Sequence, residues 1–168
     1  MSDSLTLERF HELLTFDPET GIFRWKGVKA RGRRQKPGEI AGHIHDTGHR
    51  RITIDGQFYY AHRLAWFVTY GVWPTGDLDH KSNNPDHNPT DNLRPATRTL
   101  NNANQKIRSD NTSGCKGVYK PTGRKKWTAR AGRKYLGTFD LKEEAAAAYD
   151  AEARRLYGPY ARTNEDLR

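Results

Sequence analysis

The segment Asp77-Leu78-Asp79-His80 is followed by a loop over residues 81–91 that is rich in Asn, Asp and Pro, then by Asn92-Leu93-Arg94 and by Asn101. The residues that could carry chemistry here are one imidazole, one carboxylate and two amides. This order and spacing is typical of a site that holds one metal ion and cleaves a phosphodiester, rather than of a purely structural motif. It makes the chain a candidate nuclease.

Each residue type in this stretch has a physical role in such a reaction. Phosphodiester cleavage requires a deprotonated water, a cation that neutralises charge in the transition state, and stabilisation of the leaving oxygen. An imidazole with an ordinary pKa near ~6.5 suits general-base catalysis at neutral pH. The oxygen atoms of Asp79 and Asn101 suit Mg²⁺ or Mn²⁺. Taken alone, however, an Asp-His pair is more often a pair of exposed loop residues.

The overall composition favours a polyanionic partner. The 168 residues include 29 Lys and Arg against 20 Asp and Glu, which gives a net charge of +9 and an isoelectric point near 9.8. Only 34% of the residues are hydrophobic and the mean hydropathy is −1.00, so small modules with modest cores are expected rather than one large core.

Cysteine content and hydropathy exclude several other classes. The single cysteine, Cys115, cannot form an internal disulfide, and no Cys/His cluster indicates a structural zinc site. No stretch approaches the ~20 apolar residues of a membrane span. We therefore expect a cytoplasmic protein with neither a membrane anchor nor a small-molecule cofactor.

The first 60 residues predict a helix, a turn and a hairpin. Apolar residues at Leu7, Phe10, Leu13 and Leu14 share one helical face, and the segment 17–21 breaks it before a strand at 22–25. Residues 26–50 lack periodicity and predict a loop that either contacts phosphates or is simply solvated. Its basic residues are Lys26, Lys29, Arg31, Arg33, Arg34 and Lys36. Asp55-Gly56 then predicts a two-residue turn between strands at 51–54 and 57–60.

Three helices and three strands are expected after the hairpin. An apolar face predicts a helix from about His62 to just before Gly71, and a second helix is expected over 97–107 with Leu100 and Ala103 inward. Residues 109–114 form a polar joint. Three strands follow, at 117–119, 127–130 and 135–139. A long helix comes after them. Asp140 and Glu143 form a variant of the capping box at its start, and Gly158-Pro159 ends it.

The middle of the chain resembles the HNH family of phage and intron-encoded homing endonucleases. The resemblance covers residues 59–108 and rests on His62-Arg63-Leu64, Leu78-Asp79-His80, Asn88, Asn92-Leu93-Arg94, Thr97 and Asn101. It implies a ββα-metal fold, in which two antiparallel strands and a helix surround one divalent ion. Asparagine at the third motif position is typical of the homing branch.

The resemblance also implies roles for four residues. His80 would activate the water, Asp79 and Asn101 would bind the metal, and Asn92 would form a hydrogen bond across the loop that holds His80 in position. Two residues depart from related sequences, His87 in place of Asp and Thr90 in place of an aliphatic residue. These departures leave a degenerate, inactive nuclease as an open alternative. No catalytic role is assigned to His62 or Arg63, which could brace the site or contact a phosphate.

Cations and aromatic rings alternate in the C-terminal third of the chain. A basic sheet that carries aromatic residues can lie in a DNA groove, although a solvated basic face is the plain alternative. Strand alternation sends Trp127 and Arg130 to different faces unless a bulge intervenes.

Residues 113–164 resemble the Apetala/ethylene-response-factor DNA-binding domain. The resemblance rests on residues 113–119, Lys126-Trp127, 135–139, 143–146, Ala148-Tyr149-Asp150 and 161–164. It implies a three-stranded antiparallel sheet that contacts DNA and packs on one helix. The DNA-contacting positions that it implies are Lys116, Tyr119, Trp127, Arg130, Arg133 and Tyr135, and the nearby cations Lys120, Arg124 and Lys126 are added as expected DNA-binding residues. Tyr119, Arg130 and Tyr135 replace the family's usual Arg, Glu and Trp, so its target sequence does not transfer.

Together these patterns predict an α+β chain in four parts: a lead-in over 1–58, an HNH module over 59–108, a linker over 109–113 and a DNA-binding domain over 114–168. The predicted function is endonuclease action on double-stranded DNA with one divalent cation, Mg²⁺ in the first place and Mn²⁺ as the alternative, and no structural zinc. Nicking is favoured because no dimer interface is evident in the sequence. The domain order indicates a gene of a phage or mobile element in a bacterial cell.

Two other functions remain open at this stage. The first is a DNA-binding regulator that retains the nuclease module only as a scaffold, and metal-dependent cleavage distinguishes it from a nuclease. The second is an RNA-binding or packaging role, which charge alone supports and which leaves the spacing of Asp79, His80, Asn92 and Asn101 unexplained.

Overall fold

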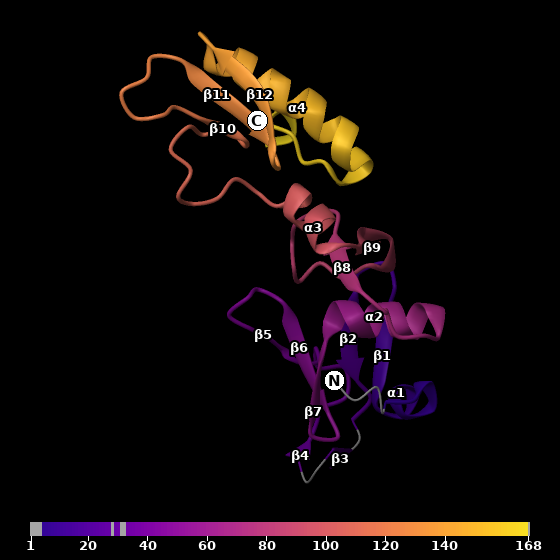
Figure 1. Cartoon of the computed structure of the whole chain (residues 1–168). Coiled ribbons are helices and arrows are strands. Elements are labelled where there is room, and N and C mark those ends of the chain that lie inside the picture. Colours follow the sequence, from indigo (N-terminus) through magenta and orange to yellow (C-terminus); the bar gives the residue numbers. More distant parts are fainter. Residues whose placement is uncertain (1–4, 28, 31–32, 168) are drawn as a thin grey trace. The chain divides into compact units, whose positions relative to one another are not determined.

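The computed structural model describes residues 5–27, 29–30 and 33–167, which belong to two compact units (Figure 1). The first unit ends at Thr97 and the second begins at Arg98. Small antiparallel sheets and four α-helices confirm the α+β class. The boundary falls inside the 59–108 module expected from the sequence, and no boundary occurs at residue 58.

The first unit begins with a helix and a hairpin. Helix α1 (Leu7–Leu13) is capped by Thr6, whose hydroxyl accepts a hydrogen bond from the Arg9 amide at 3.1 Å. Strand β1 (Leu14–Asp17) pairs with β2 (Ile22–Trp25) across the expected turn, which Gly21 ends at a φ of 72°. The helix, turn and second strand are confirmed, whereas β1 was not predicted.

Residues 26–50 contain more structure than the loop predicted from their sequence. Strands β3 (Lys29–Ala30) and β4 (Arg33–Arg34) pair with each other, and β5 (His43–Ile44) pairs with β6. Two-residue ladders are too short to show a period of two in the sequence, so the loop prediction was wrong there. Arg31 lies outside the described residues.

The hairpin and the first central helix form as predicted. Strands β6 (Arg50–Ile54) and β7 (Gln57–Tyr60) pair in register around Asp55 and Gly56, whose φ angles of 49° and 85° fit a type I′ turn. Helix α2 (Ala61–Tyr70) follows directly and ends at Gly71 in the left-handed conformation.

One hydrophobic core unites the first unit. Its buried residues come from α1 and the segment before it, both hairpins, the segment before β5, α2 and the beginning of β9. They are Leu5, Phe10, Leu13, Leu14, Phe23, Trp25, Ala41, Ile52, Ile54, Tyr59, Ala61, Leu64, Ala65, Phe67 and Leu93. The expected lead-in and most of the expected nuclease module thus share a core, which is why they do not separate at residue 58.

A second hairpin in this unit carries the predicted site. Strand β8 (Asp77–His80) pairs with β9 (Leu93–Ala96), and the loop between them ends in the short 3₁₀ helix η1 (Thr90–Asn92). The extended segment and the polar loop are as predicted. Helix α3 (Arg98–Asn104) follows β9 in the chain, in the order of a ββα module, but it belongs to the second unit.

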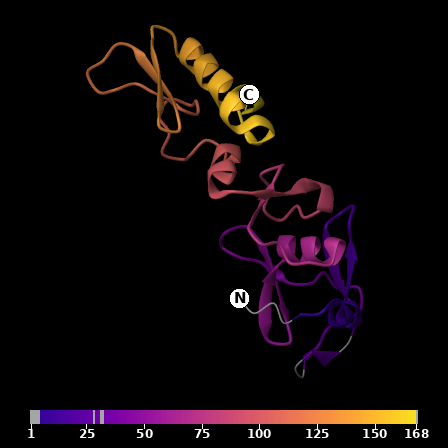
Figure 2. The same cartoon turned by 45° about the vertical axis from the view of Figure 1, so that its right-hand side comes forward.

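In the second unit, a three-stranded sheet packs on one long helix. Strands β10 (Val118–Tyr119), β11 (Trp127–Ala131) and β12 (Lys134–Phe139) are antiparallel, and α4 (Lys142–Tyr157) lies along the sheet in both Figure 1 and Figure 2. Alanines of α4 face buried sheet residues, in two clusters centred on Val118 and Ala131. This arrangement confirms the predicted domain fold.

Both ends of the second unit pack against α4. Helix α3 ends at Asn104, three residues before the predicted end at 107. It contacts α4 and the short helix η2 (Gly158–Tyr160). The last element of the described chain is η3 (Glu165–Leu167). The cap of α4 also differs from the prediction. Leu141 is the N-cap, and its amide donates to the Glu144 carboxylate at 3.4 Å, because the Asp140 carboxylate pairs with Lys126 instead.

Candidate active site and nucleic-acid interface

The imidazole of His80 is held from one side by a buried amide. His80 lies at the end of β8 and is 7% exposed, and its Nε2 is 3.0 Å from Oδ1 of Asn88. Nδ2 of Asn88 donates to the carbonyl of Asp86 at 3.0 Å, which fixes the orientation of the amide. Because Oδ1 only accepts, Nε2 carries the hydrogen and Nδ1 carries the lone pair. His80 is therefore held in the tautomer that can accept a proton at Nδ1.

Asn92 closes the loop between β8 and β9. Its Nδ2 donates to the carbonyl of His87 at 2.6 Å, and its Oδ1 accepts from the Ser82 amide at 3.0 Å. These hydrogen bonds cross the loop, while the ring of His80 is bonded by Asn88. The sequence motif included Asn88, but no role was assigned to it, because a loop amide gives no sign of which side chain it will meet.

Residues of the predicted lead-in support this loop directly. A β-carbon on Gly21 would lie 2.2 Å from the carbonyl carbon of Asn88, and the Thr90 amide donates to the carbonyl of Pro18 at 3.2 Å. The turn between β1 and β2 therefore lies against the backbone of the loop that carries Asn88. Only glycine fits this approach at a φ of 72°.

A partly buried ion pair fixes the same loop from β6. Arg50 donates from Nε and Nη2 to the two carboxylate oxygens of Asp86, at 2.9 and 2.8 Å. Bidentate pairs of this kind fix orientation as well as distance. Since the carbonyl of Asp86 also accepts from Asn88, this pair positions the amide that holds His80.

Asp79 is paired with an arginine of the neighbouring strand. Asp79 and Arg94 are register partners in β8 and β9, and both Nε and Nη2 of Arg94 lie within 2.8 Å of Oδ2 of Asp79. The carboxylate is 7% exposed and needs a compensating charge, which Arg94 provides. A cation bound by Asp79 would share this carboxylate with Arg94.

The residues expected to bind the cation have suitable chemistry and are divided between the two units. Asn101 lies in α3, and its Oδ1 is buried without a hydrogen-bond partner in the described part of the chain. The lone pairs of this oxygen are therefore available for a ligand. Among the described residues, no three His, Cys, Asp or Glu side chains converge on a metal position. One carboxylate and one amide suit Mg²⁺, which completes its shell with water and phosphate oxygens.

Two more histidines surround His80. The ring centroids of His62 and His49 lie 5.3 and 5.7 Å from that of His80, and 5.1 Å from each other. Burial lowers the pKa of all three rings below the usual range, most strongly for His62, and repulsion from His80 adds to the effect on the other two. All three rings are therefore neutral at neutral pH, as a general base must be.

Three of the predicted DNA-binding residues share the open face of the C-terminal sheet. Tyr119 pairs with Thr128, and Arg130 pairs with Tyr135, on the side away from α4. Tyr119 and Tyr135 are 42% and 57% exposed. Within the described residues, the side chain of Arg130 has neither a hydrogen bond nor an ion pair. This face therefore presents one cation between two exposed rings.

A bulge occurs in this sheet, but it does not bring Trp127 to the open face. The register skips Leu136 between the pairs Ala129–Gly137 and Arg130–Tyr135, so the extra residue lies in β12 and the alternation of β11 is intact. Trp127 packs against the buried cluster under the sheet. Lys120 lies over its ring at 5.2 Å, and Lys126 pairs with Asp140 at 3.2 Å.

The remaining predicted cations differ in their surroundings. Arg124 and Arg133 lie in the turns before β11 and β12, exposed and without side-chain partners in the part of the chain described here. Lys116, by contrast, is partly buried and donates to the carbonyls of Ala103 and Gln105 at 2.7 and 2.8 Å. Burial and the nearby Arg162 guanidinium lower the pKa of Lys116 to about 8.

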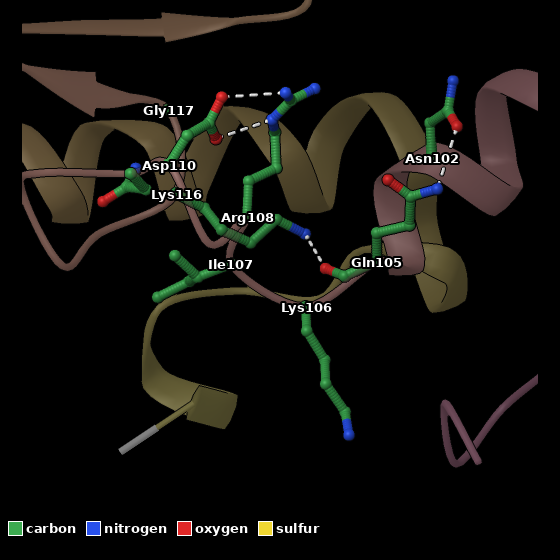
Figure 3. Close-up of a pocket in the computed structure, with 9 residues that line it drawn as sticks. Asn102, Gln105, Lys106, Ile107, Arg108, Asp110, Lys116 and Gly117 are labelled. Atoms are coloured by element: carbon green, nitrogen blue, oxygen red, sulfur yellow. Dashed lines mark hydrogen bonds and ion pairs between the residues drawn. The ribbon is translucent and has the colours of Figure 1, made fainter. Parts of the chain in front are cut away.

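Lys116 also lines a pocket of about 290 Å³ in the second unit (Figure 3). The figure shows its ammonium directed at the carbonyl of Gln105, while Arg108 pairs with Asp110 beside it. The side chain of Lys116 is thus directed at the carboxyl end of α3, where it donates hydrogen bonds to two carbonyls, and not at the open face of the sheet.

This difference predicts opposite effects for two substitutions. Arg130→Ala should remove one phosphate contact and lower the slope of log K against log salt concentration by about 0.9, without changing stability. Lys116→Met should leave that slope unchanged and lower the free energy of unfolding by about 1–3 kcal/mol, because the hydrogen bonds from the ammonium to the carbonyls of Ala103 and Gln105 are lost. DNA titrations over a range of salt, with urea unfolding of each variant, measure both. A reduced salt slope for Lys116→Met would place that lysine on DNA instead.

Comparison with known proteins gives two kinds of match, one to a nuclease family and one to plant proteins. Residues 59–103 match the model of the HNH endonuclease family. This HNH segment runs from β7 to α3 and contains Asp79, His80, Asn88, Asn92 and Asn101. The HNH resemblance predicted from the sequence is confirmed.

The curated relatives are plant proteins, named as ethylene-responsive transcription factors or as dehydration-responsive element-binding proteins. An ethylene-responsive transcription factor of Arabidopsis thaliana is 57% identical over 60 residues, which are 32% of this chain and 23% of the relative. Dehydration-responsive element-binding protein 2D of Arabidopsis thaliana is 53% identical over 51 residues, or 26% and 25% of the two chains. Ethylene-responsive transcription factor 3 of Nicotiana tabacum is 66% identical over 35 residues, or 21% and 16%. The chain thus spans a quarter or less of these relatives.

These relatives confirm the second resemblance predicted from the sequence. No solved structure matches the chain significantly. Among the described residues, no helix is both long and apolar enough to cross a lipid bilayer.

Proposed function

We propose that the chain is a metal-dependent endonuclease of homing type that hydrolyses phosphodiester bonds in double-stranded DNA. The observation that carries this proposal is the fixed tautomer of His80, a buried imidazole whose Nε2 is held by Asn88 in a segment similar to HNH endonucleases. The hydrogen bond satisfies a buried ring nitrogen, as burial requires, and it also determines which ring nitrogen carries the lone pair.

His80 has the central role in the proposed reaction. Its neutral ring accepts a proton at Nδ1 from a water molecule, and the resulting hydroxide attacks phosphorus while the bond to the leaving oxygen breaks. Asn88 keeps Nε2 protonated and directs the ring, and Asn92 maintains the loop that holds Asn88 in place. The lowered pKa of His80 keeps the ring in its basic form at neutral pH.

A divalent cation completes the proposed site. Asp79 would hold it, and Asn101 is proposed as a second ligand from the sequence spacing. When bound, Mg²⁺ or Mn²⁺ supplies positive charge that stabilises the transition state and the leaving oxygen. Arg94, which pairs with Asp79, orients that carboxylate within the hairpin.

The second unit is proposed to bind the DNA that the first unit cleaves. Its open sheet face carries Tyr119, Arg130 and Tyr135, and Arg124 and Arg133 flank it. The plant relatives include a protein named for binding a dehydration-responsive element. Because the three face residues differ from those usual in that family, we propose a different or broader target sequence.

The main alternative is a DNA-binding regulator whose HNH segment serves as a scaffold. Incubation of the purified protein with supercoiled plasmid, in Mg²⁺, Mn²⁺ or EDTA, separates the two functions. The nuclease produces open circles with either metal and none in EDTA, and nicked rather than linear product is expected from a single site per chain. Tight binding without strand breaks in any condition would support the regulator.

Asn88 provides a second test of the proposed mechanism. Asn88→Ala should slow nicking by about 10- to 100-fold, as is typical for loss of a group that orients a catalytic histidine. Asn88→Asp should retain more activity, since a carboxylate also accepts from Nε2. Single-turnover rates measure both variants, with circular dichroism as a check on folding. Equal rates for wild type and Asn88→Ala would remove Asn88 from the mechanism.

An origin in a phage or mobile element of a bacterial cell stays a proposal. It rests on the order of a nuclease segment followed by a DNA-binding segment, whereas the relatives found are plant proteins.

A further inference from the structure

The three-stranded sheet of the first unit has an open face that the HNH resemblance does not explain. In β6 and β7, Ile52, Ile54 and Tyr59 point into the core. Alternation and register place the neighbouring residues on the opposite face, where Arg51 pairs with Tyr60 and Thr53 with Phe58. Arg51 is also paired with the exposed His43 of β5.

The central group on this face is an arginine that has no protein partner. The guanidinium of Arg51 lies 3.8 Å above the ring of Phe58 and 6.0 Å from that of Tyr60. Among the described residues it has no ion pair and no hydrogen bond, and its Nε is buried without a partner. Stacking therefore holds the guanidinium in place, and the Nη groups, unlike the buried Nε, are left to donate to a ligand.

The neighbouring aromatic ring is exposed without a structural reason. Phe58 is 43% exposed, although the core of the same hairpin buries Ile52 and Tyr59 almost completely. The edge of the Phe58 ring meets Tyr60 at a centroid distance of 6.3 Å. Proteins that bind nucleic acids often combine an exposed aromatic ring with an unpaired guanidinium. Bases stack on the ring, and a phosphate binds to the guanidinium.

This face continues to the catalytic histidine. Tyr60 stacks on His62 at 5.5 Å and 21°, and His62 meets His80 edge to face at 5.3 Å. His49, whose Nδ1 is 3.2 Å from the Thr47 hydroxyl, lies beside the same rings. A row of contacting side chains thus leads from Phe58 through Tyr60 and His62 to His80.

We propose that Arg51, Phe58 and Tyr60 form a substrate-strand surface, which binds the DNA strand on one side of the scissile phosphate. Arg51 binds a backbone phosphate, and the rings of Phe58 and Tyr60 contact the adjoining sugars and bases. The chain's net charge of +9 and the continuity with His80 argue for DNA as the occupant. The inference rests on the proposed nuclease function and assigns its substrate contacts to residues outside the catalytic loop.

Footprinting tests this surface without requiring cleavage. The full chain is bound, in EDTA, to a duplex that it selects from a random-sequence library, and the DNA is cut with hydroxyl radicals. Arg51→Gln and Phe58→Ala should each remove one stretch of protection and leave the protection due to the second unit unchanged. Tyr70→Ala, at a 53% exposed ring at the end of α2, is the matched control and should leave the footprint complete.

Nicking kinetics give an independent readout. Arg51→Gln and Phe58→Ala should raise KM roughly tenfold with kcat nearly unchanged, as the loss of one stacked or phosphate contact does. Arg51→Lys retains the charge and should recover part of the loss, which an unfolded variant would not show. Wild-type footprints and KM values in both variants would overturn the inference while leaving the nuclease proposal intact. A missing footprint segment in a protein that never nicks DNA would support the surface and contradict the nuclease.

Discussion

Replacement of His80 by alanine is expected to lower the single-turnover rate of plasmid nicking by about 10²- to 10⁴-fold, the range for loss of a general base. The ring is the only group held by Asn88 in a defined tautomer, and no other described imidazole has that support. His49 and His62 lie close by, but substitution at either should have a smaller effect.

The control for this variant is DNA binding. His80→Ala removes no residue of the C-terminal sheet, so the dissociation constant for plasmid or duplex DNA should match that of the wild type. Rates and affinities measured on one preparation separate loss of chemistry from loss of structure. A variant that still nicks at the wild-type rate would show that another residue activates the water.

Substitution of Gly21 by alanine is expected to destabilise the first unit strongly. The new β-carbon would meet the backbone of Asn88 at 2.2 Å and that of Pro89 at 2.3 Å, at a backbone φ of 72°. Strain and overpacking together should cost about 3–5 kcal/mol of the free energy of unfolding. Nicking should fall as well, because the loop that carries Asn88 must move.

Gly38 offers a matched control, since its φ is 79° but an added β-carbon has nothing within 4 Å. Gly38→Ala should lower the free energy of unfolding by only about 1–2 kcal/mol, because the strained backbone conformation is the single source of destabilisation there. Urea unfolding of the two variants measures the difference, which reports the contact between the turn and the loop. Equal destabilisation would mean that the loop yields to the added methyl group at little cost.

The local elements of this fold follow from local signals in the sequence. Asp55-Gly56 specifies its turn through backbone conformations that these two residues adopt readily, and Gly71 and Gly158 end helices for the same reason. The strands and helix of the second unit were predicted for similar reasons, with short β-branched or aromatic runs between turn residues. Two-residue strands such as β3 and β5 give no such signal, because a ladder of that length has no period.

Domain boundaries depend on contacts between distant residues, and there the prediction differed from the structure. Phe10, Phe23 and Leu93 share one core although they are far apart in sequence. Lys116 and Arg162 both donate to the carbonyl of Ala103, which ties α3 to the second unit. Neither arrangement leaves a periodic pattern in the residues involved.

The candidate site divides in the same way. Asp79, His80, Asn92 and Asn101 could be selected because they match the motif of the HNH family, whose chemistry uses those residue types. Asn88, Arg50 and Gly21 act through hydrogen bonding, ion pairing and close packing around His80, and these roles appear only when the loop and the lead-in hairpins are folded together. The supporting residues of a site are in general less visible in sequence than the reacting ones.

The most direct test of the nuclease proposal is to nick supercoiled plasmid with the wild-type protein and Mg²⁺ in water enriched in ¹⁸O, and to measure the mass of the terminal phosphate at the nick. Hydrolysis by a water that His80 activates predicts one ¹⁸O atom in that phosphate, with no product in EDTA. DNA that is fully bound and remains supercoiled, or nicked ends without ¹⁸O, would contradict the proposal.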